Sequence, residues 1–160
     1  MYDVPTLGLN YRMSELQAAL GRSQLSRVDE ILARRAANFA VLRDALAGAP
    51  DLRLLDASDP RQAQTHYCAS VVLEGGLGAR RLDAVEALNA AGIGTSLYYP
   101  QPVPRMAYYR ERDGYDAARF PEAERISDRS IALPVGPHLT TDDVRHVAET
   151  VLAVCARLRG

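Results

Sequence analysis

Lysine and tryptophan are both absent from this 160-residue sequence, and all 19 of its Lys+Arg positions are arginine. The missing lysine excludes any reaction that this chain would run through a Schiff base on a lysine amine. Long hydrophobic runs are absent as well, because no apolar stretch approaches the roughly 18 residues that a membrane-spanning helix needs. The first residues, Met1–Pro5, do not resemble a secretory signal peptide. We therefore expect a cytoplasmic protein with no membrane partner.

Cysteine and histidine are scarce. Cys68 and Cys155 lie far apart in the sequence, and neither has a metal-type or redox-type spacing. We expect two reduced and mostly buried thiols. The histidines, His66, His138 and His146, are scattered, so we predict no metal site, and we expect His138 and His146 on the surface. The sequence contains no Ser/His/Asp or Cys/His arrangement typical of nucleophilic catalysis.

Excess charge is missing too, since the formal net charge is -1. A nearly neutral chain has no basic field to attract nucleic acid, so we predict no nucleic-acid partner. A hydrophobic content of 48% and a charged content of 24% are ordinary for a globular protein. A chain of this length forms one domain and can bury about 70% of its unfolded surface.

The segment 14–46 predicts a long, kinked helix. Ser14 and Gln17 have the spacing of a capping box at its start, and Gly21 is the expected kink. Gly48-Ala49-Pro50 ends the helical pattern. The run has more apolar positions than a small sheet can cover, so we expect part of it to be exposed. Its apolar residues at helical spacing are Leu16, Ala19, Leu20, Leu25, Val28, Ile31, Leu32, Phe39, Leu42 and Leu46.

Short strands are predicted at 51–56, 65–73 and 93–99 from their leucine, β-branched and aromatic residues. A further short apolar stretch covers 131–134, and the glycines of 75–78 predict a turn. Only one helical crossover separates the strands. We therefore predict an α+β fold, with a small antiparallel or mixed three- to four-stranded sheet, helices packed on one side of it, and the long kinked helix in front.

Further helices are expected between and after the strands. The segment 80–91 predicts a helix that ends at Gly92 in a C-cap position, and its inward positions are Leu82, Val85, Ala87 and Leu88. The segment 106–110 predicts one helical turn. Pro121 favours a helix through residue 129, and Thr140 begins the last helix.

The most specific motif is Asn10-Tyr11-Arg12-Met13-Ser14-Glu15. Other motifs follow it in a consistent order: His66-Tyr67, Gly92-Ile93-Gly94-Thr95, Tyr98-Tyr99-Pro100, Ile131-Ala132-Leu133-Pro134 and Leu139-Thr140-Thr141-Asp142-Asp143-Val144. Through these motifs, the chain from about Gly8 to Val151 resembles the C-terminal part of nucleotide-sugar aminotransferases of the DegT/StrS type.

This resemblance implies a fold-type-I aminotransferase that uses pyridoxal 5'-phosphate. In that family a large domain carries the Schiff-base lysine, a smaller C-terminal domain closes the site, and the active site forms at a homodimer interface. By this resemblance, residues 1–13 form an irregular lead-in and cross-dimer loop, and residues 14–160 form the small domain with its leading helix. The large lysine-bearing domain is absent, and its lysine would fall upstream of Met1.

The resemblance also assigns cofactor-binding residues. Asn10 and Arg12 match family positions that reach across the dimer toward the partner's cofactor phosphate and substrate. An amide donor and a guanidinium fork both suit phosphate oxygens. Without the resemblance, the same residues would be a loop asparagine and a solvated surface arginine.

His66, Tyr98 and Tyr99 match positions near the substrate in the family. Family members usually have His-Tyr-Pro where this chain has Tyr98-Tyr99-Pro100. Tyr98 therefore replaces an imidazole with a neutral phenol, which still donates a hydrogen bond. The alternatives are a structural, hydrogen-bonded histidine at His66 and aromatic packing at the two tyrosines.

Two functions follow from these expectations. The first is part of an enzyme that moves an amino group from an amino acid, with glutamate as the expected donor, to a keto sugar on a nucleotide. This chain alone would be inactive, and no catalytic residue is assigned to it. The second is a noncatalytic module that binds a nucleotide sugar or pairs with a complete homologue.

Overall fold

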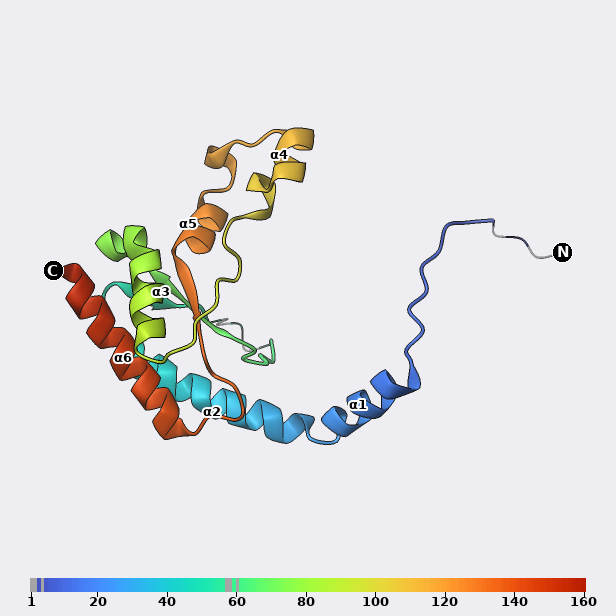
Figure 1. Ribbon diagram of the computed structural model, residues 1–160, viewed down its shortest axis with the longest axis horizontal. Coiled ribbons are helices and arrows are strands. Elements are labelled where there is room, and N and C mark those ends of the chain that lie inside the picture. The colour runs from blue at the N-terminus through green and yellow to red at the C-terminus, as the bar shows by residue number, and fades with distance from the viewer. Residues whose placement is uncertain (1–2, 4, 57–58, 60) are drawn as a thin grey trace.

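The computed structural model describes the chain except for residues 1, 2, 4, 57, 58 and 60. Figure 1 shows helices around a small central sheet, with two projections from this body. The elements in chain order are α1 (Glu15–Leu25), α2 (Val28–Leu46), β1 (Leu52–Leu54), β2 (Ala69–Leu73), η1 (Gly75–Arg80), α3 (Arg81–Ala90), η2 (Val103–Arg105), α4 (Ala107–Asp113), η3 (Ala117–Arg119), α5 (Pro121–Arg129), β3 (Ser130–Leu133) and α6 (Thr141–Arg159), where η marks a 3-10 helix.

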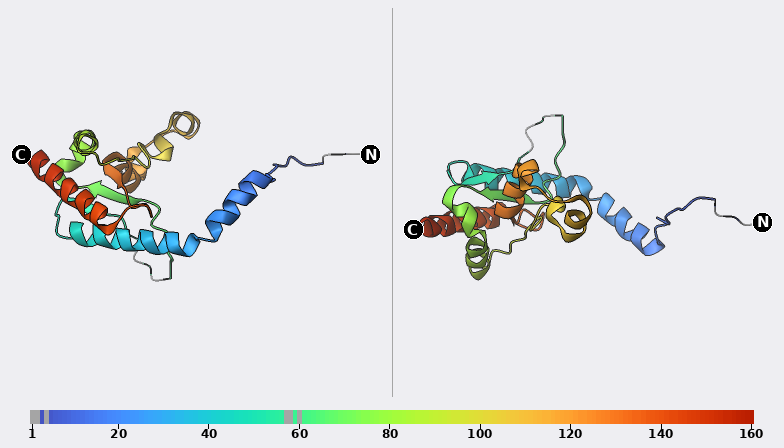
Figure 2. Two further views of the ribbon diagram at one scale, coloured as in Figure 1. Left: turned by 60° about the horizontal axis from the view of Figure 1, so that its bottom comes forward. Right: turned by 90° about the horizontal axis from the view of Figure 1, so that it is seen from above.

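The sheet has three antiparallel strands in the order β1-β2-β3, which confirms the α+β prediction. Val71 in the central strand pairs with Leu54 on one side and Ile131 on the other. Neighbouring strand residues point to opposite faces, and Val71 and Val72 are both buried, so both faces of β2 are covered. The sequence predicted helices on one side only. In the structure α5 packs against β2, and α2 and α5 lie on different sides of the sheet (Figure 2).

One hydrophobic core joins the sheet to α2, α3 and α6. Leu42 of α2, Val71 of β2 and Val144 of α6 are among its most deeply buried side chains. Leu82 on α3 is 66% exposed, so the prediction that it faces inward is wrong. Leu88 is buried as predicted, and Ala84, which was not predicted to face inward, is buried beside it.

The long N-terminal helix is broken later than predicted. The Ser14–Gln17 capping box is confirmed, with the Gln17 N–H donating to Ser14 Oγ at 3.3 Å. Gly21, however, lies inside α1, and the chain breaks at Ser26–Arg27. There the Arg27 N–H donates to the Gln24 carbonyl, three residues back, so the i→i−4 pattern of the helix stops. A glycine inside a helix lowers its stability but does not by itself bend it.

The third strand differs from the one predicted. Segment 93–99 forms no strand and touches the sheet through a single bridge between Ser96 and Ala132. The strand beside β2 is instead β3, and all four of its residues are buried. Similarly, only Ala69–Leu73 of the predicted strand 65–73 is extended in the sheet, and the glycines of 75–78 lie in η1.

The predicted helix ends agree better with the structure. Helix α5 spans the predicted residues, and Gly92 has the positive φ of 82° that a C-cap glycine adopts. A capping box between Thr140 and Asp143 begins α6. No described helix is long and apolar enough to cross a membrane. Cys155 is buried, Cys68 is partly buried, and both are free thiols.

The two projections leave the body in different directions (Figure 1). One consists of the N-terminal segment and α1. Every residue of α1 is described and none is buried, and Leu16, Leu20 and Leu25 are 85%, 65% and 70% exposed. This agrees with the expected surplus of apolar positions. The other projection is an arm made of η2, α4 and η3, which precedes α5 in the sequence and stands above the sheet in Figure 1.

Candidate functional site

A hollow of about 240 Å³ lies beside the C-terminal end of β3. Its walls include Tyr67, Cys68, Ser96, Tyr98 and His138, and the chain from 132 to 136 runs along it. These residues come from three separate segments, which meet only in the folded chain. The hollow combines apolar side chains with hydroxyl, thiol and imidazole groups, so it can bind a polar ligand by hydrogen bonds.

The segment that carries Tyr98 is attached to the sheet by Ser96. The Ser96 N–H donates to the Ala132 carbonyl at 3.2 Å, and the Ala132 N–H donates to the Ser96 carbonyl at 2.8 Å. Tyr98 then lies with its ring centroid 6.5 Å from that of Tyr67, in a tilted arrangement. Tyr98 is 42% exposed and lines the hollow. The bridge therefore positions the phenol across from Tyr67.

Tyr99 has a different environment. Its ring meets the Tyr98 ring edge to face, with centroids 5.9 Å apart, and it is 67% exposed. It is not among the described residues that line the hollow. Tyr99 is therefore open to solvent and lies outside the described lining of the hollow.

His66 also lies outside the hollow's described lining. Its ring stacks on Phe39 of α2, with centroids 4.3 Å apart, and its backbone has a positive φ of 44°. The His66 Nδ1 is buried without a hydrogen-bond partner among the described residues. Non-glycine residues at positive φ are uncommon and often lie at functional sites. The residue that reaches the hollow is its neighbour, Tyr67.

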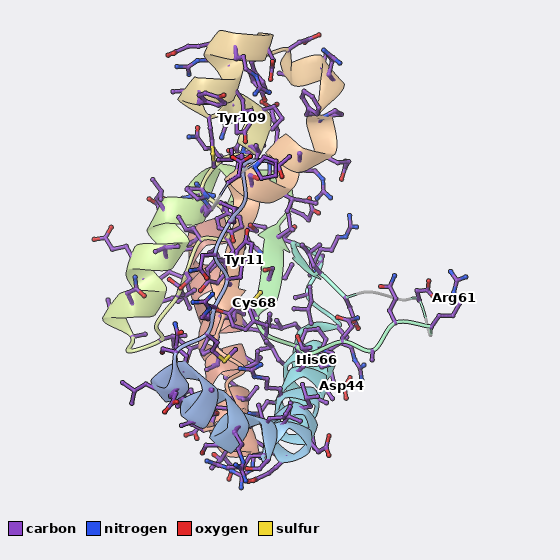
Figure 3. The ribbon with its side chains drawn as sticks, turned by 90° about the vertical axis from the view of Figure 1, so that its right-hand side faces the viewer. Tyr11, Asp44, Arg61, His66, Cys68 and Tyr109 are labelled. Atoms are coloured by element: carbon purple, nitrogen blue, oxygen red, sulfur yellow. The ribbon has the colours of Figure 1, made fainter. Side chains whose placement is uncertain are left out.

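Arg35 of α2 is a residue that the sequence analysis did not identify. Its guanidinium lies over the Tyr67 ring, 5.7 Å from the ring centroid, as in a cation–π contact. The Arg35 Nε is buried without a hydrogen-bond partner within the described residues. Figure 3 shows His66 and Cys68 on the segment that leads into the sheet, with Tyr109 well apart from both on the arm.

His138 reaches the hollow through a tightly held turn. Its surface location is confirmed, but the sequence did not indicate that it joins Tyr67 and Tyr98. Buried Asn38 of α2 donates from Nδ2 to the Gly136 carbonyl at 3.0 Å and to the Leu139 carbonyl at 3.1 Å. A Cβ on Gly136 would lie 2.4 Å from Cε1 of His138, so the imidazole packs directly against this glycine.

The arm is attached to α5 by charged contacts. Arg105 Nη1 donates to Asp128 Oδ2 at 2.9 Å, and Arg105 Nη2 also bonds this carboxylate. The hydrogen bonds from Arg105 lower the pKa of Asp128. Tyr115 donates to Glu124, and its burial together with this bond raises the pKa of Tyr115 to about 12. These contacts hold the far end of the segment that begins at Tyr98.

Asn10 and Arg12 lie in the irregular segment before α1, and neither is among the described residues that line the hollow. The Arg12 N–H donates to Asn10 Oδ1 at 2.9 Å, and both residues are exposed. The structure therefore brings Tyr98 together with Tyr67, but it does not bring Asn10 and Arg12 to the same site. Among the described residues, no group of three or more His, Cys, Asp or Glu side chains could hold a metal ion.

The sequence model of the DegT/DnrJ/EryC1/StrS aminotransferase family matches residues 1–152. Among curated relatives, the spore coat polysaccharide biosynthesis protein SpsC of Bacillus subtilis is 34% identical over 94% of this chain and 39% of its own length. The dTDP-4-dehydro-2,6-dideoxy-D-glucose 3-dehydratase of Saccharopolyspora spinosa is 26% identical over 98% of this chain and 34% of its own length. The chain thus spans less than half the length of these relatives.

Solved structures of sugar-modifying enzymes have the same fold. DesV of S. venezuelae, in complex with a ketimine intermediate, is 31% identical with a TM-score of 0.81, over 94% of this chain and 38% of that one. The PLP-form of the putative sugar aminotransferase Spr1654 of Streptococcus pneumoniae is 25% identical with a TM-score of 0.86, over 98% and 39%. DesI in the presence of its TDP-sugar product is 28% identical with a TM-score of 0.76, over 92% and 39%.

Proposed function

The chain belongs to the DegT/DnrJ/EryC1/StrS aminotransferase family, and we propose that it is the small-domain portion of a pyridoxal-phosphate-dependent aminotransferase acting on a nucleotide-linked keto sugar. The observation that carries this proposal is the family match over residues 1–152, supported by the likeness to DesV and DesI. In the proposed enzyme, glutamate is the amino donor. The enzyme works in the cytoplasm.

The chain's own residues do not fit covalent attachment of the cofactor, because the sequence has no lysine. Pyridoxal phosphate, when bound, supplies the electron sink that amino-group transfer requires. The proposed roles of this chain are to bind and to position: Asn10 and Arg12 toward a partner's cofactor phosphate, and His66, Tyr98 and Tyr99 toward the nucleotide sugar.

The proposed partner is a lysine-bearing large domain within a homodimer. The N-terminal projection suits this arrangement, because α1 exposes its leucines and leaves Asn10 and Arg12 free to reach another subunit. An isolated helix of 11 residues is marginal in water, so packing against a partner would stabilise it. In this division, residues 1–13 form the cross-dimer loop and residues 14–160 form the small domain.

The second candidate is a noncatalytic module that binds a nucleotide sugar or pairs with a complete homologue. The observation that favours it is again the absence of lysine. Both candidates share the hollow and the exposed N-terminal projection. They differ in whether amino-group transfer occurs once a lysine-bearing domain is present.

One experiment separates the two candidates. The chain is joined to the lysine-bearing domain of a DesV-like relative, and formation of 2-oxoglutarate from glutamate is measured with a dTDP-linked keto sugar. The matched control replaces the lysine of the added domain with alanine. Turnover that depends on this lysine supports the aminotransferase. A correctly assembled dimer that binds dTDP but shows no turnover supports the noncatalytic module.

A second measurement tests the chain by itself. Incubation with pyridoxal phosphate and reduction with borohydride should give no covalent adduct at any internal residue, because no lysine amine is available. The α-amino group of Met1 can react weakly, so peptide mapping must locate any adduct. A stoichiometric adduct at an internal residue would contradict the proposed division of roles.

A further inference from the structure

A second hollow lies between α3 and α6, and we call it the α3–α6 groove. Its volume is about 560 Å³, more than twice that of the hollow beside β3. Ala87 and Ala90 line it from α3, and Ala153 lines it from α6. Because alanine side chains are short, they leave room for larger side chains of another helix to pack between α3 and α6. The groove is therefore a surface on which a helix can dock.

Two opposite charges border the groove. Glu149 and Arg157, both on α6 and both exposed, are among its lining residues. Within the described part of the chain, neither side chain takes part in an ion pair or a side-chain hydrogen bond. The two residues are eight positions apart, so they are separated by about 12 Å along the helix axis. A helix that carries the opposite two charges at a similar spacing would pair with both.

The two helices of the groove run in opposite directions. At one end, Arg80 before α3 donates from Nη1 to the Leu158 carbonyl near the end of α6 at 2.8 Å. Toward the other end, Ala90 lines the groove together with His146, which lies near the start of α6. The groove therefore has a polarity, with the positive charge of Arg157 toward the first end.

The side chains that suit this groove are those of α1. Leu16 and Leu20 are four residues apart, so they lie on one side of the helix, with Ala19 and Ser23 beside them. Every residue of α1 is described, and none is buried. The helix therefore presents, on its exposed surface, leucines of the size that the alanines of the groove leave room for.

The charges of α1 match those of the groove in order and spacing. Glu15 and Arg22 are the only charged residues of α1, and they are seven positions apart, or about 10.5 Å along the axis. Neither side chain forms an ion pair or a hydrogen bond with any described residue. If α1 lies antiparallel to α6, Glu15 comes beside Arg157 and Arg22 comes beside Glu149.

The α1 helix cannot reach the groove of its own chain. Between them lies α2, a helix of 19 residues that spans about 28 Å. Helix α1 and the pair α3 and α6 lie toward opposite ends of the longest axis (Figures 1 and 2). Two copies that lie side by side in opposite directions would each bring α1 to the groove of the other. A two-fold exchange of this kind closes at a dimer.

We propose that the α3–α6 groove binds α1 of a second copy of this chain. In the exchanged dimer, Leu16 and Leu20 pack among the alanines of the groove, and the two charges of α1 pair with the two charges of α6. Because exposed ion pairs contribute little affinity, the leucines supply most of the binding and the charges set the direction of α1. This assembly goes beyond the proposed function, because it requires neither a large domain nor a cofactor.

Sedimentation velocity of the full chain at rising concentration tests the exchange, and we expect a monomer–dimer equilibrium. Ala153→Gln puts a long neutral side chain into the groove at an exposed position of α6. It should weaken dimerisation by about tenfold or more. The matched control is Ala156→Gln, at another exposed position of α6 that is not among the described lining residues. This control should dimerise like the unaltered chain.

Charge reversal tests the direction of α1. Arg157→Glu and Glu15→Arg each bring two like charges together, so each variant should dimerise about tenfold or more weakly. When the two variants are mixed, one groove has the original ion pair and the other has the same pair with its charges exchanged. The mixture should therefore form a heterodimer. Arg110→Glu, on the exposed surface of α4, controls for the change in net charge and should leave dimerisation unchanged.

Two results would overturn the proposal. One is a chain that stays monomeric at the highest concentration at which it is soluble. The other is a dimer that Ala153→Gln and Arg157→Glu leave unchanged, since the groove would then not hold it. Neither result bears on the proposed function, which is measured separately by lysine-dependent turnover in the joined enzyme.

Discussion

The imidazole of His66 stacks on the ring of Phe39, with centroids 4.3 Å apart and planes 30° from parallel. This contact joins the segment before β2 to the middle of α2. The backbone of His66 has a positive φ of 44°, and the next residue, Tyr67, lines the hollow. The contact therefore links the packing of the core to the geometry of the candidate site.

Loss of this stacking should destabilise the fold measurably. Aromatic pairs contribute about 0.5–1.5 kcal/mol beyond their buried area. In a double-mutant cycle of His66→Ala and Phe39→Leu, we expect a coupling free energy of about that size. Urea unfolding of the four proteins measures it. A parallel cycle with His146→Ala, on exposed α6 surface, should give coupling near zero, and equal values in the two cycles would contradict the prediction.

The Arg105–Asp128 ion pair should make the acid stability of the arm depend on Asp128. Its pKa is lower in the folded chain, mainly through hydrogen bonds from Arg105. A lowered folded pKa means that this contribution is present above the unfolded value of about 4 and is lost as pH falls below it. The Asp128 side chain is 41% exposed, so solvent screening keeps the effect small. We expect Asp128→Asn to flatten the loss of stability between about pH 4 and pH 2.

Thermal unfolding of both proteins as a function of pH checks this prediction. Asp44→Asn is the matched control, because Asp44 lies on the exposed surface of α2 and pairs only with its neighbour Arg43. If Asp128→Asn and the unaltered chain lose stability in parallel as the solution is acidified, the ion pair does not contribute in this way.

The exposed leucines of α1 should make the isolated chain self-associate or bind a hydrophobic dye. Contiguous exposed apolar surface promotes association and dye binding. We expect the chain to bind a hydrophobic dye or to self-associate with rising concentration, and Leu16→Glu together with Leu20→Glu should reduce either effect. Leu82→Glu is the control, because Leu82 lies on α3 instead of α1 but is as exposed as Leu20 (66% against 65%). If the chain stays monomeric and binds no dye at high concentration, the result would argue against a binding partner that packs on α1.

Arg12 should act on the opposite subunit of an assembled dimer. In the joined enzyme, Arg12→Ala should weaken cofactor or substrate binding by roughly ten- to a hundredfold, equivalent to about 1.5–3 kcal/mol for a charged hydrogen bond. The fold should be unaffected, because Arg12 is exposed and precedes the first helix. Equilibrium binding of dTDP and pyridoxal phosphate measures the loss, and Arg22→Ala on the exposed surface of α1 is the control.

Subunit mixing makes the prediction for Arg12 sharper. A heterodimer combines one Arg12→Ala subunit with one subunit that lacks the Schiff-base lysine. If Arg12 acts across the interface, its loss falls on the site that is already inactive, and the other site keeps its activity. If Arg12 acts within its own subunit, both sites are damaged. Near-zero activity in a properly assembled heterodimer would show that Arg12 does not act across the dimer.

Local patterns predicted the helix ends well. The Ser14–Gln17 capping box, the first-turn Pro121 and the C-cap Gly92 each occur where the sequence indicated them. These features depend on residues within one helical turn of each other, so a few neighbouring side chains suffice to specify them. The kink predicted at Gly21 was misplaced, because the break at Ser26–Arg27 has no glycine or proline to indicate it.

Long-range packing decided the elements that the sequence could not. Segments 93–99 and 130–133 both contain apolar residues, but only the second pairs with β2, and it is buried along its whole length. The sequence could not predict the whole candidate site either: Tyr98 was expected near the substrate, but His138 was expected only on the surface. Both line one hollow in the folded chain, where the turn that carries His138 is bonded to Asn38 across 98 residues of sequence.

The sequence alone therefore determined the family, most helix boundaries and the absence of a lysine amine, because these depend on residue identity and short-range spacing. The tertiary structure decided which apolar stretch became β3. It also decided that Tyr67, His138 and Tyr98 line the same hollow, whereas His66 packs on Phe39 and is not among the described lining residues. Contacts of this kind join residues far apart in the chain. They form only when burial of the shared core outweighs the entropy lost in bringing the segments together.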